Sequence, residues 1–203
     1  EVHHRVKNNL QVLNSFLNLE RRAYGNNPNL ILDNMQARLS SLALLHEKTY
    51  NTNDFVNINL KDYIDDQDST LQALFNAKNI NFKSDINEDI SLSIEIITPL
   101  LLIIDELTMN AIKHAFPDKD MGNKEIYKVI DYKDENVCEL ILKDNGVGLE
   151  NPEKLINHNL GWEIINSLTN QMNGKIEIID CKQGTAFKLT FPTSLDYSLE
   201  GEE

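Results

Sequence analysis

The stretch that decides the fold is DELTMNAIKHAF, at residues 105–116. It closes a helix that we expect to begin at Thr98-Pro99, where a capping hydroxyl precedes a proline in the first helical position. At about 100° per residue, Glu106, Asn110 and Lys113 fall within a narrow arc. A different face collects the apolar residues Leu100, Ile104, Leu107, Ala111 and Ala115. The pattern predicts one core face and, on another face, a carboxylate, an amide and an ammonium that project together.

These three polar groups suit phosphate and metal chemistry. A carboxamide oxygen can ligate Mg²⁺, a lysine can neutralise phosphate oxygens, and a carboxylate can hold a metal-bound water or orient a nucleophile. His114, beside Lys113, is a further candidate for a phosphate contact. The alternative is an ordinary solvated helix face, because such triplets are common on amphipathic helices.

A glycine-containing segment, DNGVGL at residues 144–149, follows a strand-like run. Its Asn-Gly pair favours a sharp turn, and Gly146 and Gly148 let backbone approach a ligand closely. Asp144, at the end of the strand, could accept a hydrogen bond from an amino group such as that of adenine. A plain turn is the alternative, because a lone D-x-G-x-G pattern is weak evidence.

Two shorter signals follow further along the chain. Gly161 precedes a helix, so backbone N–H groups there could face phosphates. Thr185 opens the last strand and could present a hydroxyl.

The first fifty residues have a different character. Apolar residues recur at spacings of four and three, which predicts helices over residues 1–24 and 29–50, separated by Gly25-Asn26-Asn27-Pro28. An antiparallel helical hairpin cannot bury its stripe alone, so we predict a homodimer through residues 1–50 with a four-helix bundle. His3 and His4 point about 100° apart, so at most one of them faces a catalytic partner. A neutral imidazole is a good phosphoryl acceptor near pH 7.

The pattern changes after residues 51–54 to mixed helices and strands, which predicts an α+β chain. Strands are expected at 55–59, 80–85, 90–94, 125–133, 137–143, 175–181 and 185–191, and helices at 60–77, 98–115 and 162–173. The acidic tail, residues 193–203, is expected to fray.

Composition narrows the possible partners. A net charge of −13 argues against nucleic acid and anionic membranes, which need clustered Lys and Arg. No apolar run reaches about 18 residues, so no membrane span is predicted. Cys138 and Cys181 fit no metal spacing and are interpreted as small buried residues, compatible with a reducing cytoplasm. Because Glu1 lies in mid-helix pattern, we expect a missing upstream part that could hold a sensor domain.

The segment EVHHRVKNNLQV at residues 1–12 resembles the phosphoacceptor box of the two-component sensor histidine kinases with an H-R-x-K-N motif, relatives of the HWE kinases. Residues 106–116 resemble their N box, 144–149 and 159–165 their glycine boxes, and 183–191 the terminal G-T strand of the GHKL ATPase fold. The resemblance extends to about residue 192. It implies a phosphoacceptor hairpin over 1–50 and an ATP-binding α/β sandwich with a mixed sheet over 51–192.

The resemblance also implies roles. His4 would be the phosphorylated histidine and Glu106 would polarise the metal shell or the nucleophile, while Asn110 would ligate Mg²⁺. The remaining implied contacts with ATP are phosphate contacts by Lys113 and His114, adenine recognition by Asp144, shaping of the pocket and lid by Gly146, Gly148 and Gly161, and support of the base end by Thr185. The implied reaction is ATP-dependent autophosphorylation of His4, followed by transfer to an aspartate of a response-regulator receiver domain.

The sequence departs from the family pattern in two places. The second glycine box keeps only Gly161, with a short lid over 149–160, and Arg5 follows His4 where commoner kinases carry an acid. Two alternatives remain: a GHKL-type ATP-binding scaffold or switch without histidine phosphorylation, and an anti-sigma type of serine kinase. The complete histidine box speaks against the first, and the N-terminal hairpin is left unexplained by the second. Phosphorylation in cis and in trans both stay open, because the handedness of the turn at 25–28 decides between them.

Overall fold

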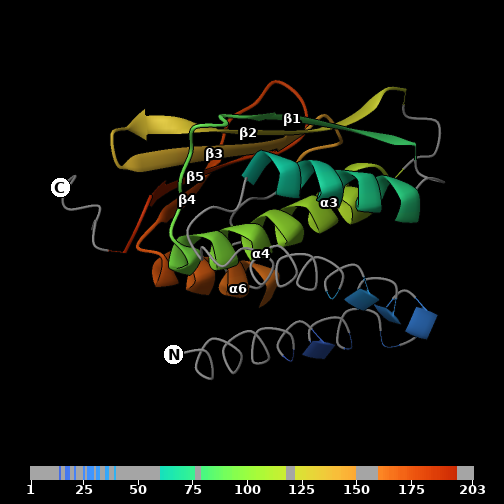
Figure 1. Ribbon diagram of the computed structural model, residues 1–203. Coiled ribbons are helices and arrows are strands. Elements are labelled where there is room, and N and C mark those ends of the chain that lie inside the picture. Colours follow the sequence, from blue (N-terminus) through green and yellow to red (C-terminus); the bar gives the residue numbers. More distant parts are fainter. Residues whose placement is uncertain are drawn as a thin grey trace.

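The computed structural model describes residues 60–75, 79–117, 122–149 and 160–195, together with scattered positions between 14 and 39. Its helices are α3 (Leu60–Leu74), α4 (Ile94–Asn110), the π-helix η2 (Ala111–Ala115) and α6 (Leu160–Gln171), and its strands are β1 (Ile80–Ile86), β2 (Lys124–Asp134), β3 (Val137–Asp144), β4 (Lys175–Ile179) and β5 (Ala186–Pro192). Figure 1 shows α3, α4 and α6 together on one face of the sheet.

Within the described residues the strands form one five-stranded sheet in the order β1-β2-β3-β5-β4. The β1–β2 pair is parallel, whereas β2–β3, β3–β5 and β4–β5 are antiparallel. The sheet is therefore mixed, and the predicted α+β class with a mixed-sheet sandwich is confirmed.

The β2–β3 hairpin forms where the sequence predicted it, with its turn at Glu135 and Asn136. Along β3, Cys138, Leu140 and Leu142 are buried, and the residues between them are half-buried. A period of two is the pattern of a strand with one face against a core. That face packs on the helices, and the opposite face of the sheet carries no helix of the described part of the chain (Figure 1).

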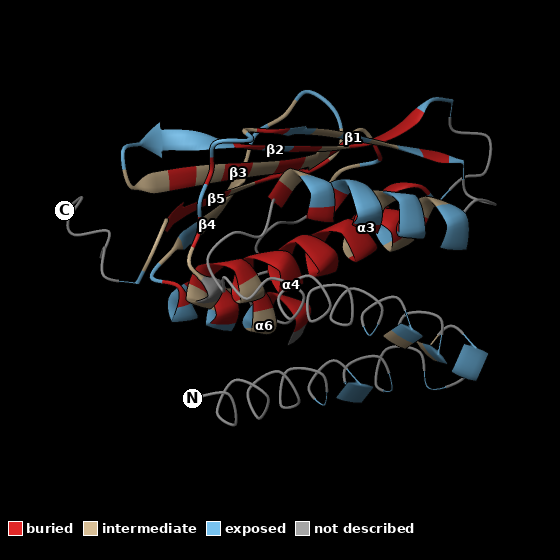
Figure 2. Ribbon diagram, viewed as in Figure 1, coloured by how far each residue is buried: buried red, intermediate tan, exposed pale blue. Residues whose placement is uncertain are grey.

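Helix α4 is the centre of the sandwich. Figure 2 colours almost its whole length as buried, and Leu100, Ile103 and Ile104 are each 0% exposed. Its predicted core face is confirmed, because the five apolar residues assigned to it are all buried: Leu100, Ile104, Leu107, Ala111 and Ala115.

The predicted start of this helix at Thr98-Pro99 is wrong. Helix α4 begins four residues earlier, at Ile94, with Ser93 in the extended N-cap position, so Pro99 lies inside the helix. An interior proline costs about 3 kcal/mol. Burial of Ile96 and Ile97, at 0% and 2% exposure, contributes about 2 kcal/mol each, which outweighs that cost.

The predicted strand at 90–94 is also wrong, because residues 90–93 have no regular structure. Ile90 and Leu92 are buried, so the alternation that suggested a strand reflects an extended segment against the core. Its Ser93 N–H donates to the Thr193 carbonyl at 2.9 Å instead of joining the sheet. The predicted strand at 55–59 lies outside the described residues.

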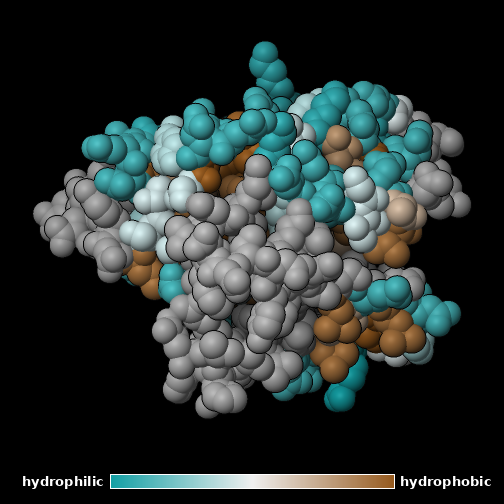
Figure 3. All heavy atoms as spheres, in the orientation of Figure 1, coloured by the Kyte–Doolittle hydropathy of each residue, from teal (hydrophilic) through white to brown (hydrophobic). Residues whose placement is uncertain are grey.

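The described positions of the N-terminal hairpin are helical on both sides of a turn at Gly25. Pro28 is already helical, and the Ile31 N–H donates to the Asn27 carbonyl at 3.3 Å. Leu17, Leu32 and Leu39 are exposed. Figure 3 shows apolar surface at the lower right, where Figure 1 draws the described parts of this hairpin.

No helix in the described ranges is both long and apolar enough to cross a membrane.

Candidate nucleotide site

Asp144 ends β3 and is held rigidly in place. Its Oδ1 accepts hydrogen bonds from the backbone N–H groups of Gly146 at 2.9 Å and Thr185 at 3.2 Å. Its own N–H donates to the Thr185 carbonyl at 3.0 Å. The residue is 3% exposed, and this burial raises the pKa of its carboxyl group, against the opposing effect of the hydrogen bonds from Gly146 and Thr185. The site thus holds a buried carboxylate with one oxygen fixed by backbone donors.

The turn after Asp144 requires glycine. A Cβ on Gly146 would lie 2.1 Å from the Ala115 carbonyl oxygen, and a Cβ on Gly184 would lie 2.0 Å from that of Asp144. Gly148 and Gly184 also have φ of +78° and +79°, which side chains rarely adopt. Gly146 and Gly184 are therefore required by close contacts with the protein's own backbone, at the carbonyls of Ala115 and Asp144.

The two sequence boxes around residues 105–116 and 144–149 meet in space. The Val147 N–H donates to the Ala115 carbonyl at 3.0 Å. Ala115 ends η2, whose hydrogen bonds follow the wider π-helical pattern. The end of the long helix thereby closes against the glycine turn.

Glu106 and Asn110 lie together on the last α-helical turn of α4. The Asn110 Nδ2 donates to Glu106 Oε1 at 3.4 Å. Glu106 is only 3% exposed, so the alternative of an ordinary solvated face is wrong for this residue. Asn110 is half-buried.

Lys113 and His114 follow on η2, half-buried and exposed respectively. The predicted arc assumed α-helical geometry as far as Lys113. Because η2 has π-helical geometry, the α-helical spacing assumed in the prediction does not hold at Lys113.

The start of α6 is anchored near the same end of the sheet. Trp162 packs against Phe187, with ring centroids 6.0 Å apart, and Phe187 lies two residues after Thr185 on β5. Gly161, directly before Trp162, is buried. This contact brings the second glycine box to the end of the sheet that carries Asp144. His3 and His4, and Asn159 of the second box, lie outside the described residues.

The oxygen atoms of Asn110 and Glu106 are of the chemical type that Mg²⁺ binds, with phosphate and water oxygens completing its octahedron. No group of three or more His, Cys, Asp or Glu suited to a metal occurs among the described residues. These few protein oxygens fit a metal ion that is coordinated mainly by the phosphates of a bound ligand. They do not fit a metal site whose ligands all come from the protein.

Comparison with known families gives two matches, one after the other along the chain. Residues 1–75 match the family described as "Histidine kinase", and residues 95–195 match the "Histidine kinase-, DNA gyrase B-, and HSP90-like ATPase" family. The chain belongs to the histidine kinases. The predicted family and its GHKL-type ATPase fold are confirmed.

Curated proteins similar to this chain include sensor histidine kinase PdtaS of Mycobacterium tuberculosis. That protein is 29% identical over 201 residues, which cover 95% of this chain and 38% of PdtaS. The chain thus spans less than two fifths of that relative's length.

Solved structures show the same fold. The blue-light activated histidine kinase EL346 of Erythrobacter litoralis superposes with a TM-score of 0.71 at 20% identity, over 95% of this chain and 61% of that chain. Histidine kinase ThkA in complex with response regulator protein TrrA superposes with a TM-score of 0.55 at 18% identity, over 96% and 60%.

Sequence analysis did not single out Gly184 as a close-contact position. The signal in the sequence was the Gly-Thr pair that precedes the last strand. Only the hydroxyl of its threonine was considered as a functional group. In the structure, the N–H groups of Gly146 and Thr185 hold the Asp144 carboxylate, and Gly184 has to be glycine because a Cβ there would meet the Asp144 carbonyl.

Proposed function

We propose that this chain is the catalytic core of a sensor histidine kinase that transfers the γ-phosphoryl group of ATP to His4. It would then pass the group to an aspartate of a response-regulator receiver domain. The observation that carries the proposal is the junction of the Asp144 loop with the end of the α4–η2 helix. This junction supports the proposal because it joins the loop of Asp144, which would read the base, to the helix end that would bind the phosphates. The division we propose is a phosphoacceptor hairpin over 1–50, a nucleotide domain over 51–192 and a tail over 193–203.

At the base end, Asp144 would accept a hydrogen bond from the exocyclic amino group of adenine. Backbone donors engage Oδ1, so Oδ2 is the oxygen that would receive the amino group. Guanine carries a carbonyl oxygen at the corresponding place, and two acceptors facing each other repel. Gly146 and Gly148 would let the base lie close to the loop, and Thr185 would keep the carboxylate oriented.

At the phosphate end, Asn110 would ligate Mg²⁺ and Glu106 would orient the amide through their hydrogen bond. The metal would supply neutralisation of charge on the phosphate oxygens. Lys113 and His114 would add positive charge and hydrogen-bond donors there, and the N–H groups near Gly161 would cover the phosphates. Phosphoryl transfer needs mainly positioning and charge neutralisation, which these residues would provide.

The hairpin would provide both the acceptor and the dimer. Leu17, Leu32 and Leu39 are exposed in the single chain, and pairing of two hairpins would cover such residues in a four-helix bundle. A receiver domain as partner is supported by the fold shared with ThkA, whose structure was solved with its response regulator. A cytoplasmic location is part of the same proposal.

The decisive experiment is autophosphorylation with γ-labelled ATP and Mg²⁺ on the wild type, His4→Gln and His3→Gln. We expect label that is acid-labile and alkali-stable, lost in His4→Gln and retained in His3→Gln. Bound nucleotide without label in any of the three proteins would favour the scaffold alternative. Label in His4→Gln equal to that of the wild type would refute His4 as the acceptor.

The metal assignment is tested separately with Asn110→Ala. We expect autophosphorylation to fall by about 10²-fold or more, since a direct contact to the reacting phosphates is lost. Asn170→Ala is the matched control, because Asn170 is exposed on the distal part of α6. Equal rates for the two variants would remove Asn110 from the site.

A further inference from the structure

Asn145 leaves the sheet in an unusual way. Ile126 and Asp144 are paired in the β2–β3 register, so Glu125 and Asn145 form the next pair. The Asn145 N–H donates to the Glu125 carbonyl at 3.2 Å, as an antiparallel ladder requires. The reciprocal bond does not go to the Asn145 backbone. The Glu125 N–H instead donates to the side-chain Oδ1 of Asn145 at 2.8 Å.

The side-chain amide of Asn145 therefore takes the place of a peptide group. Its Oδ1 acts as the missing backbone acceptor, and its Nδ2 donates to the Asn123 carbonyl at 2.8 Å. The true carbonyl of Asn145 turns away and accepts from Gln183 Nε2 at 2.8 Å. The ladder is thus continued by a side chain while the main chain departs toward Gly146 and the glycine turn.

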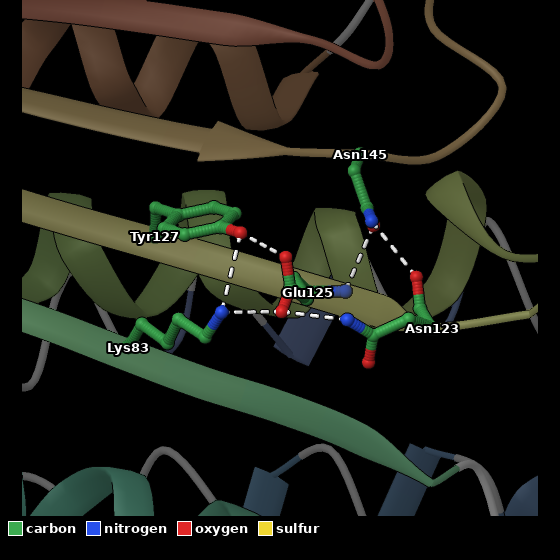
Figure 4. Close-up of polar contacts among 5 residues, drawn as sticks. All are labelled: Lys83, Asn123, Glu125, Tyr127 and Asn145. Carbon is green, nitrogen blue, oxygen red and sulfur yellow. Dashed lines mark hydrogen bonds and ion pairs between the residues drawn. The ribbon is translucent and has the colours of Figure 1, made fainter.

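The strand on which this amide docks is itself fixed by a polar network, drawn in Figure 4. The Glu125 carboxylate accepts hydrogen bonds from Lys83, Tyr127 and Asn123, the last at 2.7 Å. The Lys83 ammonium also lies 5.1 Å from the Tyr127 ring centroid. Lys83 is on β1, so the network ties the start of β2 to the neighbouring strand. The amide of Asn145 therefore bonds to a part of β2 that other polar contacts hold in place.

From this arrangement we infer that Asn145 is the positioning residue of the adenine subsite, and that its amide holds the glycine turn so that Asp144 faces the base. The inference rests on the proposed function, since it assumes that Asp144 recognises adenine. Only asparagine supplies an acceptor and a donor at this reach: alanine supplies neither, and aspartate lacks the donor. The polar network around Glu125 fixes the start of β2, to which the Asn145 amide is bonded, without itself contacting the adenine subsite.

The test measures binding of ADP and of GDP, each with Mg²⁺, to the 203-residue chain by calorimetry. Two side-chain hydrogen bonds, one of them part-buried, are lost in Asn145→Ala, so we expect ADP to bind about tenfold more weakly. GDP makes no favourable contact with Asp144, so its affinity should change little. The preference for ADP over GDP should therefore narrow by a similar factor. Asn145→Asp keeps the acceptor and should fall between the wild type and Asn145→Ala.

Two control variants separate positioning from general damage. Lys113→Ala should weaken ADP and GDP equally, because it acts at the phosphates and leaves the ratio unchanged. Asn170→Ala should change neither affinity.

Partial unfolding lowers the binding of both nucleotides together, so an unchanged ADP to GDP ratio in Asn145→Ala overturns the inference even if both affinities drop. Unchanged affinities in that variant overturn it as well, and the proposed function survives both results. A wild type that binds neither nucleotide overturns the proposed function and this inference together.

Discussion

Lys128 offers the sharpest test of the packing. It lies on β2 beneath α3, and its side chain is 0% exposed. Its ammonium pairs with Asp68 of α3 and lies 5.4 Å from the centroid of the Phe82 ring. Asp68 in turn accepts a hydrogen bond from Ser84 Oγ at 2.7 Å. A buried cation therefore depends on one carboxylate, and removing that carboxylate should be costly.

The substitution Asp68→Ala removes the counter-charge and leaves the ammonium buried. Breaking a buried pair in this way costs about 3–5 kcal/mol, out of a total stability of about 5–15 kcal/mol. The double variant Lys128→Met/Asp68→Ala also removes the buried charge and fills its place with an apolar side chain. It should cost about 1–2 kcal/mol, mainly from the lost Ser84 bond and imperfect packing. The single variant should therefore be less stable than the double variant.

The assay is urea unfolding followed by fluorescence of Trp162, the one tryptophan in the chain. It packs against Phe187 inside the sandwich, so it reports on this domain. With an m-value of about 2 kcal/mol/M, a loss of about 4 kcal/mol lowers the midpoint by about 2 M. Asp65→Ala, at an exposed position on the same helix, should cost under about 0.5 kcal/mol. A midpoint shift below about 0.5 M for Asp68→Ala, or a double variant less stable than the single, would refute the reasoning.

Three other outcomes follow from the structure. Gly184→Ala should abolish binding of ADP, because its Cβ would lie 2.0 Å from the Asp144 carbonyl, whereas Gly122→Ala has nothing within 4 Å and should bind normally in the same titration. Burial raises the pKa of the Cys138 thiol to about 12, so a thiol reagent at pH 8 should label the half-buried Cys181 and reach Cys138 only after unfolding, as counted by mass spectrometry. Because burial raises the pKa of Asp144, its carboxylate takes up a proton at higher pH than an ordinary aspartate. ADP affinity should thus fall as the pH is lowered through that range, and a flat profile in Asp144→Asn would identify the group.

Local sequence patterns were sufficient to predict much of the fold. The β2–β3 hairpin and the helices near 60–77 and 162–173 were predicted from periodicity and turn residues, and the structure places α3, β2, β3 and α6 there. Such elements are predictable because their periodicity reflects which side chains face the core, and each period is contained in neighbouring residues. The glycines at 146 and 148 were also found by sequence, since a turn with close backbone contacts restricts residue type at the position itself.

Other features depended on partners far along the chain. Pro99 suggests a helix start by local rules, yet burial of Ile96 and Ile97 against the sandwich extends the helix past it. The end of this helix at Ala115 was predicted, but the π-helical geometry of its last five residues and their contact with Val147 were not, because Val147 lies far along the chain.

What the sequence determined by itself was the family, the order of its motifs and the residue types of the candidate site. Only the tertiary structure decided that Gly184 must lack a side chain beside Asp144 and that the amide of Asn145 continues the β2 ladder. The pairing of Lys128 with Asp68 was decided there too. Each of these depends on a contact between residues 20 to 60 positions apart. The residue type alone does not specify such a contact, because its energy arises only when the sheet and helices bring both groups together out of water.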